Sequence, residues 1–253
     1  MFDHDHPSQL QGQVALITGA AQRIGAEIAR QLHAEGVDLL LHYRRSGSAA
    51  QSLAANLNGI RNDSVRLVRA DLGELATLPG LIEAASAWRG RLDLLVNNAS
   101  SFYPTPFGEV QTEQWEDLMA ANLKGPFFLT QAAAPLLRAS HGQVVNLVDI
   151  HAERPLAAHS VYSIAKAGNA MMVRTLAREL GPEVRVNGIA PGAILWPEQG
   201  LAEEAKQTIL ARTALQRPGT PADIARTLIF LVRDAPYITG QIIAVDGGRT
   251  LQQ

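Results

Sequence analysis

Apolar and polar residues are arranged in blocks along this chain, and the period of the blocks changes in a regular way. Short continuous apolar runs lie at residues 14–18, 37–44, 65–70, 92–98, 143–149, 184–192 and 241–247. Between them apolar residues recur at helical spacing, most extensively over 112–138, 160–180 and 221–232. Apolar strands separated by helices are typical of parallel sheets that are covered on both faces. The pattern predicts an α/β fold, a Rossmann-type doubly wound sheet of seven parallel strands.

No linker or repeat divides the chain, so residues 1–253 are expected to form a single domain. Residues 1–12 are polar and lack an apolar signal-peptide core, which predicts a flexible N-terminal tail. Residues 193–216 are the long interruption of the alternating pattern. Because long loops in compact domains often cover a site, we expect 193–216 to form a substrate loop.

Composition narrows the class of function. With 47% hydrophobic and 18% charged residues the chain is typical of soluble, ordered proteins, and a net charge of -2 attracts neither nucleic acid nor an anionic membrane. No apolar run approaches the roughly 18 residues of a membrane-spanning helix. The lack of cysteine excludes disulfides, thiol catalysis and Cys-ligated metals, and His4 and His6 lack a third metal ligand. We expect a cytoplasmic protein that binds no metal, membrane or nucleic acid.

The turn after the first strand has the composition of a phosphate-binding loop. Small residues there let the backbone approach a pyrophosphate, and the helix N-terminus offers free N–H groups. The stretch reads T-G-x-x-x-R-x-G, with Arg23 at the place of a middle glycine. Many strand–helix turns use glycine structurally, but the position after the first strand of an α/β chain favours the cofactor interpretation. The expected cofactor contacts are Gly19, Arg23, Ile24 and Gly25.

The end of the second strand indicates which dinucleotide is bound. NAD enzymes place an acidic residue there for the ribose 2′-hydroxyl, but Asp38 begins its strand, whereas ligands lie at the carboxyl ends. A basic cluster stands at the carboxyl end instead, and each guanidinium bond to a 2′-phosphate is worth about 1.5–3 kcal/mol. Arg23 either adds to this cluster or faces the pocket. We expect NADPH to be the cofactor, bound here by Tyr43, Arg44, Arg45 and Ser46.

A tyrosine and a lysine form a candidate catalytic pair. Tyr162 and Lys166 are four residues apart and share a helix face. An ammonium group near the phenol favours tyrosinate, so Lys166 is expected to lower the pKa of Tyr162 and allow proton exchange near neutral pH. This spacing is common in ordinary surface helices, and the interpretation depends on its context.

That context consists of short motifs spread over the chain: TGAAQRIG (18–25), ADL (70–72), NNAS (97–100), ANLKGPFF (121–128), YSIAK (162–166), RVNGIAPG (185–192) and VDGG (245–248). Jointly they are highly specific, and over nearly its full length the chain resembles the short-chain dehydrogenase/reductase family. The resemblance implies that Tyr162 is the acid/base, that Lys166 binds the nicotinamide ribose, and that Asn122 supports a water-linked proton path. It also implies cofactor contacts at Asp71, Leu72, Asn98, Ala99, Ser100, Tyr162, Lys166, Pro191 and Gly192.

Two positions depart from the general family pattern. Asp149 stands where the family has a serine, and Arg23 stands where it has a glycine. The two departures coincide in one branch that the chain resembles, the pteridine reductases. By that resemblance Phe102 stacks the pterin against the nicotinamide, and Arg23 and Ser100 contact both cofactor and pterin. Trp196 and Tyr103 either line the pocket or pack against a loop, and His151 and His159 are expected to face solvent.

Asp149 carries the functional interpretation. An ionised carboxylate only accepts hydrogen bonds and would repel the alkoxide that forms when a carbonyl is reduced. Reduction of a C=N bond needs a proton on nitrogen, which a carboxyl group beside Tyr162 can relay or align. We therefore expect hydride transfer from NADPH to a 7,8-dihydropterin or dihydrofolate. The plainer interpretation of Asp149 is a loop residue that caps the next turn.

Two alternatives stay open at this point. One is a 3-oxoacyl-type carbonyl reductase of the same family, and the other is an NADP(H)-binding sensor without turnover. The sequence does not divide the proton transfers between Asp149 and Tyr162. The resemblance also implies a homotetramer that pairs helices 112–138 and 160–180 and the C-terminal strands. The pocket residues expected for substrate are Arg23, Ser100, Phe102, Asp149, Tyr162 and Trp196.

Overall fold

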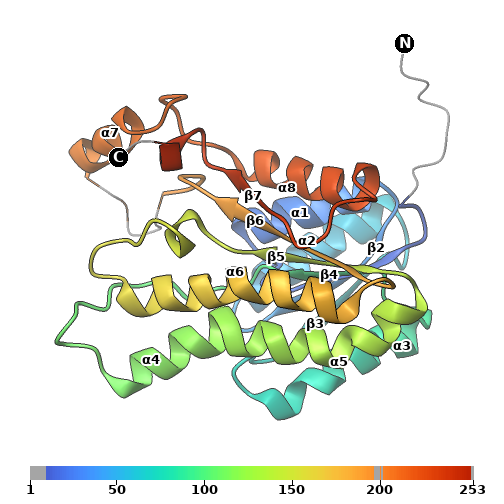
Figure 1. The fold of residues 1–253 in the computed structure, drawn as a ribbon. Helices are drawn as coiled ribbons and strands as arrows, with labels where there is room; N and C mark the ends of the chain where they lie inside the picture. Colours follow the sequence, from blue (N-terminus) through green and yellow to red (C-terminus); the bar gives the residue numbers. More distant parts are fainter. Residues whose placement is uncertain (1–9, 197–199, 201, 252–253) are drawn as a thin grey trace.

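A central parallel sheet organises the computed structural model, which describes residues 10–196, 200 and 202–251. Within these residues the sheet has seven strands in the order β3-β2-β1-β4-β5-β6-β7, all parallel (Figure 1). The predicted doubly wound α/β fold is confirmed. The strands are β1 (Val14–Ile17), β2 (Asp38–Tyr43), β3 (Val65–Arg69), β4 (Leu94–Asn97), β5 (Gln143–Leu147), β6 (Arg185–Pro191) and β7 (Ile242–Val245).

Helices cover both faces of this sheet (Figure 1). Helices α1 (Arg23–Ala34), α2 (Gly47–Ile60) and α8 (Pro221–Ile229) lie on one face, and α3 (Leu78–Arg89), α5 (Gly125–Ala139) and α6 (Ser160–Leu180) lie on the other. Successive residues of a strand point to opposite faces. Ala15 and Ile17 of β1 accordingly join the core under α1 and α8, whereas Val14 and Leu16 join the core under α3 and α5.

Strand order reverses around β1, which pairs with β2 on one side and β4 on the other. The chain therefore winds outward in both directions from β1, and the loops that leave β1 and β4 separate at the carboxyl edge of the sheet. In open α/β sheets this reversal creates the crevice in which ligands bind.

The predicted long helical region near 112–138 contains a change of helix type. It consists of α4 (Thr112–Met119), a π-helical turn (Ala120–Lys124) and α5. In the π turn the N–H of Gly125 bonds to the carbonyl of Ala120, five residues back. Pro126 has no N–H, so it cannot donate the usual helical bond to the Asn122 carbonyl. The proline explains why the helix changes its hydrogen-bond pattern here.

Two expected boundaries need correction. Leu10 is only 2% exposed and belongs to the core, and the N–H of Gly12 bonds to the carbonyl of Gly36 at 3.1 Å, so the flexible tail predicted over 1–12 extends too far. The stretch 193–216, expected to be irregular, contains α7 (Glu203–Ala211). Two acidic residues in its first turn favour this helix through its dipole. Residues 1–9, 197–199 and 201 lie outside the described residues.

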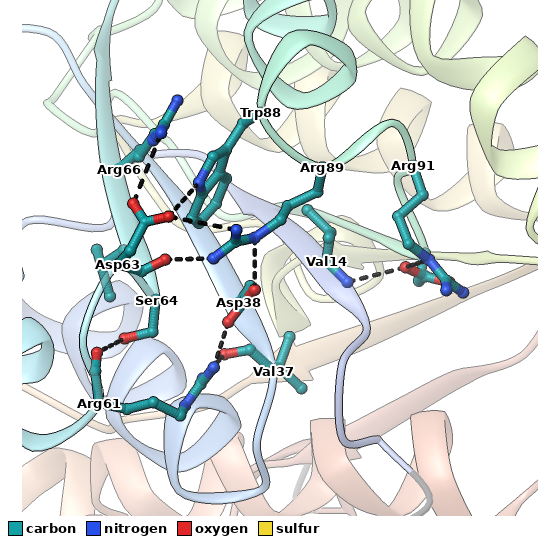
Figure 2. Close-up of polar contacts among 12 residues, drawn as sticks. Val14, Val37, Asp38, Arg61, Asp63, Ser64, Arg66, Trp88, Arg89 and Arg91 are labelled. Atoms are coloured by element: carbon teal, nitrogen blue, oxygen red, sulfur yellow. Dashed lines mark hydrogen bonds and ion pairs between the residues drawn. The ribbon is translucent and has the colours of Figure 1, made fainter.

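Asp38 anchors an ionic network at the amino end of β2, as Figure 2 shows. Its carboxylate accepts hydrogen bonds from Arg61 and, at 2.7 Å, from Nε of Arg89. Arg89 also bonds to Asp63 and lies over the ring of Trp88, 4.4 Å from its centroid. Asp38 thus lies at the edge of the sheet opposite the ligand crevice, as expected from its place at the start of the strand, and the structure adds its role in this network.

Replacing Asp38 with Asn tests this assignment. The amide retains the shape but lacks the charge that two guanidinium groups share, so the free energy of unfolding should fall by about 1–3 kcal/mol. Urea unfolding measures that change. Affinity for NADPH should stay as in the unaltered protein, and a marked change in the relative affinities for NADH and NADPH would place Asp38 at the ribose instead.

Candidate active site

A cleft of about 710 Å³ opens at the carboxyl edge of the sheet. The loops after β1, β2, β3 and β4 line it together with the start of the π turn. Thirteen residues proposed from sequence as cofactor contacts line this cleft: Gly19, Arg23, Ile24, Gly25, Tyr43, Arg44, Arg45, Ser46, Asp71, Leu72, Asn98, Ala99 and Ser100. The catalytic candidates and Pro191, Gly192 and Trp196 are outside this set.

The glycines of the β1–α1 turn permit a close approach of three backbone segments. Gly19 has φ of +61°, and a Cβ on it would lie 2.9 Å from Cα of Ala99. A Cβ on Gly25 would overlap the carbonyl oxygen of Gly19 and would lie 2.6 Å from Nδ2 of Asn98. That amide nitrogen donates to the carbonyls of Thr18 and Gly19, which joins the β1 and β4 loops. Side chains at these two positions would push the β1 and β4 loops apart and so disturb the turn that lines the cleft.

Arg23 adopts a backbone conformation that favours glycine. Its φ is +54°, and it begins α1 at the position where the family pattern has a glycine. Its Nη2 donates to the carbonyl of Trp196 at 3.3 Å, so the phosphate-loop turn is joined to the chain that follows β6. A non-glycine residue stays in this strained conformation only where the surrounding structure holds it there, and such residues are common at functional sites.

Arg23→Gly should therefore change the stability of the fold and the affinity for the cofactor in opposite directions. The left-handed conformation costs about 1–2 kcal/mol, and the extra freedom of glycine in the unfolded chain offsets part of the gain, so we expect a net stabilisation of up to about 1 kcal/mol. NADPH affinity should fall. Arg30→Gly, on the same helix, should lower stability by about 1 kcal/mol. A loss of stability in Arg23→Gly would show that its contact with Trp196 outweighs the strain.

His42 also lines this cleft, although no motif in the sequence points to it. It is buried at the end of β2, where Nδ1 accepts from the N–H of Gly19 at 3.2 Å and Nε2 lies 3.1 Å from the carbonyl of Ala70. Only the neutral ring with its proton on Nε2 satisfies both neighbours. His42 thereby joins the phosphate loop to the end of β3, just before Asp71.

Stability should depend on the protonation of His42. Burial lowers the pKa of His42 below its ordinary value of 6.5, with Asp71 acting in the opposite sense and Arg44 in the same sense. The unfolded chain then binds more protons than the native chain as the pH falls below 6.5, so native stability is complete above that pH and declines below it. His33, whose pKa burial also lowers, contributes in the same direction.

Unfolding midpoints between pH 8 and pH 5 check this dependence. His42→Gln removes the titrating ring, so its stability should decline less steeply below pH 6.5 than that of the unaltered protein. The exposed His141, replaced by Asn, serves as the control. Equal slopes for the His42 variant and the unaltered protein would contradict the assignment.

The basic cluster after β2 is partly engaged with acids. Nη1 of Arg44 lies 3.5 Å from Asp71 and 3.9 Å from Asp117, so this side chain spans the cleft. Arg45 is exposed at the cleft rim, next to Ser46. The structure therefore brings two arginines to the rim of the cleft, and the carboxylates of Asp71 and Asp117 lie near Arg44.

Tyr162 and Asp149 are in direct contact. The Tyr162 hydroxyl donates to Oδ2 of Asp149 at 2.7 Å, while Oδ1 of the same carboxylate accepts from the N–H of His151 at 2.8 Å. Asp149 therefore caps the short 3-10 turn Ile150–Ala152, which was the plainer of its two interpretations, and it also binds the tyrosine. The two oxygens of the Asp149 carboxylate therefore bind different groups, the N–H of His151 and the hydroxyl of Tyr162.

The expected lowering of the tyrosine pKa is wrong for this arrangement. Burial and the adjacent Asp149 carboxylate raise the pKa of Tyr162 well above 10, and the Ser100 hydroxyl acts in the opposite direction. Lys166 lies farther off, with Nζ 5.7 Å from the centroid of the tyrosine ring, and it donates to the carbonyl of Leu147 at 2.8 Å. Burial lowers the pKa of Lys166 to about 8. Tyr162 thus holds its proton at neutral pH.

An aromatic stack stands beside Tyr162. The Phe102 ring meets the tyrosine edge-on at 4.8 Å between centroids, and its face stacks on His159 at 4.7 Å. His159 is half-buried by this contact, so the expectation that it faces solvent is wrong. Phe102 itself is 48% exposed, which leaves apolar ring surface open to a planar ligand. Tyr103 instead bonds to Asp117 and packs against α4.

Asn122 is fully buried in the π turn. Its Nδ2 donates to the carbonyls of Ser101 and Leu118, and its Oδ1 accepts from the Ser100 hydroxyl at 2.6 Å. The side chain thus holds the loop that carries Ser100 and Phe102.

Pro191 ends β6, and the N–H of Gly192 bonds to the carbonyl of Val245. A Cβ on Gly192 would lie 2.7 Å from Cα of Asp246, so the chain after β6 passes tightly against the end of β7. Across residues 10–196, 200 and 202–251, neither a cluster of three or more metal-binding side chains nor a helix long and apolar enough to cross a bilayer is found.

Comparison with known proteins decides the family. A family model described as enoyl-(acyl carrier protein) reductase matches residues 19–250. The chain belongs to the short-chain dehydrogenase/reductase family. It is an oxidoreductase of that type, and the resemblance drawn from its motifs is confirmed at the level of the family.

Individual relatives of this short-chain reductase differ in substrate. It is 36% identical to pteridine reductase 1 of Leishmania tarentolae, over 94% of this chain and 96% of the relative. It is 37% identical to a protein named as a ketoacyl reductase of the granaticin polyketide synthase of Streptomyces violaceoruber, over 94% and 96%. A 3-oxoacyl-(acyl-carrier-protein) reductase of Staphylococcus aureus is 34% identical, over 92% and 96%. The percentage of identical residues therefore does not distinguish a pterin substrate from a ketoacyl substrate. That distinction depends on the residues of the site.

Proposed function

We propose that this short-chain reductase is an NADPH-dependent pteridine reductase that converts a 7,8-dihydropterin or dihydrofolate to its tetrahydro form. The observation that carries the proposal is the hydrogen bond from the Tyr162 hydroxyl to Asp149. A carboxylate at this place directs the tyrosine proton, whereas the serine of the general family pattern would itself donate to a substrate carbonyl.

The chemistry of Asp149 favours a C=N substrate over a carbonyl. Carbonyl reduction builds negative charge on oxygen, and a neighbouring carboxylate would raise the energy of that charge instead of donating to it. In C=N reduction the nitrogen gains a proton. The Tyr162 hydroxyl, which is hydrogen-bonded to Asp149, would supply that proton. Pterin rings also carry N–H donors that a carboxylate binds. The raised pKa of Tyr162 keeps its hydroxyl protonated at neutral pH, so the proton is present there to be given up.

The cleft fits a dinucleotide with a 2′-phosphate. Gly19 and Gly25 leave backbone space for the pyrophosphate, and Arg44, Arg45 and Ser46 stand at the end of β2 for the 2′-phosphate. NADPH, when bound, supplies the hydride. Lys166 would hold the nicotinamide ribose, Asp71 and Leu72 the adenine, and Pro191 and Gly192 the nicotinamide.

The substrate pocket would lie between this cleft and the aromatic stack. Phe102 offers an exposed ring face for a planar pterin, Arg23 and Ser100 stand at the edge shared with the cofactor, and Asp149 and Tyr162 hold the proton. Trp196, at the start of the proposed substrate loop 193–216, would close the far side.

Assembly and location are part of the proposal. Exposed apolar side chains on α5 and α6 support helix pairing in a homotetramer: Phe127, Phe128, Ile164 and Met171. We assign the protein to the cytoplasm, with one reductase domain over 1–253. The second candidate function is carbonyl reduction, which the ketoacyl-reductase relatives favour.

Oxidation of NADPH with 7,8-dihydrobiopterin, with 7,8-dihydrofolate and with a β-ketoacyl thioester tests the function. We expect turnover with a pterin or folate, and a weaker reaction with NADH because it lacks the 2′-phosphate. Tyr162→Phe removes the proton donor and should lower kcat by about a hundredfold or more. Asp149→Ser should lower pterin turnover on a similar scale.

The same assays can also contradict the proposed function. Turnover with the thioester alone would move the protein to the carbonyl reductases. Tight NADPH binding without turnover of any of the three substrates would favour the sensor. Pterin turnover that survives in Asp149→Ser would remove Asp149 from the chemistry.

A further inference from the structure

A row of buried asparagines crosses the core behind the site. Nδ2 of Asn97 donates to Oδ1 of Asn146 at 2.9 Å, and Nδ2 of Asn146 donates to Oδ1 of Asn169 at 3.0 Å. Nδ2 of Asn169 then donates to the main-chain carbonyl of Asn122 at 2.8 Å. Every donor points the same way, from the sheet toward the π turn. We call Asn97, Asn146 and Asn169 the amide ladder.

The amide ladder joins separate elements in an apolar setting. Asn97 ends β4, Asn146 lies opposite it in β5, and Asn169 lies on α6. None of the three is more than 3% exposed. An unpaired buried amide costs about 1–3 kcal/mol, so the bonds between them are strongly favoured over a disordered arrangement. At the sheet end, Oδ1 of Asn97 has no partner among the described residues.

The π turn creates the need for the ladder's last bond. Pro126 has no N–H to donate to the Asn122 carbonyl, and Asn169 supplies a donor in its place. Tyr162, Lys166 and Asn169 fall at i, i+4 and i+7 of α6 and so share one face. The same helix face therefore carries the proton donor, the buried lysine and the residue that holds the π turn.

We infer that the amide ladder positions the catalytic groups by fixing the peptide of Asn122. From Asn122 the path continues through its Nδ2, which donates to the carbonyl of Ser101, to the adjacent Phe102, whose ring meets that of Tyr162 edge-on at 4.8 Å between centroids. Asn169 connects the amide ladder to the Asn122 peptide through its hydrogen bond to the Asn122 carbonyl. It is a positioning residue because it lies behind Asn122, away from the cleft. The inference rests on the proton-donor role of Tyr162 in the proposed function.

Asn169→Leu is the variant that tests the ladder, with Asn187→Leu as its matched control. Asn187 is also 2% exposed and also uses both ends of its amide, but its partners Ile238 and Gln241 lie away from the site. Both variants should lose stability. Asn169→Leu alone should lower kcat, by about a hundredfold, because small displacements of catalytic groups are costly. KM for NADPH should stay unchanged.

Amide hydrogen exchange over residues 118–126 gives a second readout that needs no substrate. Exchange there should accelerate in Asn169→Leu and remain unaltered in Asn187→Leu. Asn169→Ser, which is smaller, replaces the leucine variant if that one does not fold. Activity is measured with whichever substrate the unaltered protein reduces.

The outcomes separate the two proposals. Unaltered kcat and exchange in the Asn169 variants would overturn the ladder, as would equal losses of kcat in the Asn169 and Asn187 variants. If the unaltered protein reduces no pterin, the proposed function fails, and the exchange comparison still decides whether Asn169 holds the π turn.

Discussion

Pairing of β1 with both β2 and β4 is the constraint on which the rest of this molecule depends. Because all strands are parallel, their carboxyl ends share one edge, and the reversal of order at β1 separates the loops that leave that edge. The phosphate loop, the basic cluster and the loop before Phe102 meet there from distant parts of the chain. Asp38, at the opposite end of β2, lies away from this edge and binds Arg61 and Arg89.

Polar groups buried in the core behind this edge determine the electrostatics of the site. Lys166, Asn122 and Asn146 are almost fully buried, and each is hydrogen-bonded to its surroundings. Burial is what lowers the pKa of Lys166 and raises that of Tyr162. The electrostatics of the reaction therefore follow from packing, and a change that admits water would alter both groups together.

Much of this was readable in the sequence because it depends on local pattern. Apolar runs predicted the strands, glycine and basic residues at strand ends predicted the cleft, and the position of Asp38 at the start of its strand predicted that it lies away from that cleft. Groups whose role arises from contacts between distant segments were missed. His42 looks like an ordinary strand residue, and His159 stacks on Phe102 from a loop more than fifty residues away in sequence.

Two further features of the site, the role of Asn169 and the change of helix type near Asn122, can be recognised in the sequence. Asn169 continues the helical spacing of Tyr162 and Lys166, and Pro126 four residues after Asn122 signals a disturbed helix. The pKa of Tyr162 differs from the expectation because the sequence does not show how deeply the hydroxyl is buried, and burial is the largest cause of the raised pKa. The end of the tail was misplaced because a single leucine, Leu10, is too short a pattern to predict burial.

The double use of Asp149 has a consequence for how substrate preference can change in this fold. One carboxylate oxygen caps the turn that begins at Ile150, a task that serine hydroxyls also perform well. The other oxygen alone faces Tyr162. A single exchange of aspartate for serine would therefore replace the acceptor that faces Tyr162 with a hydroxyl that also donates, while the cap on the turn could be kept.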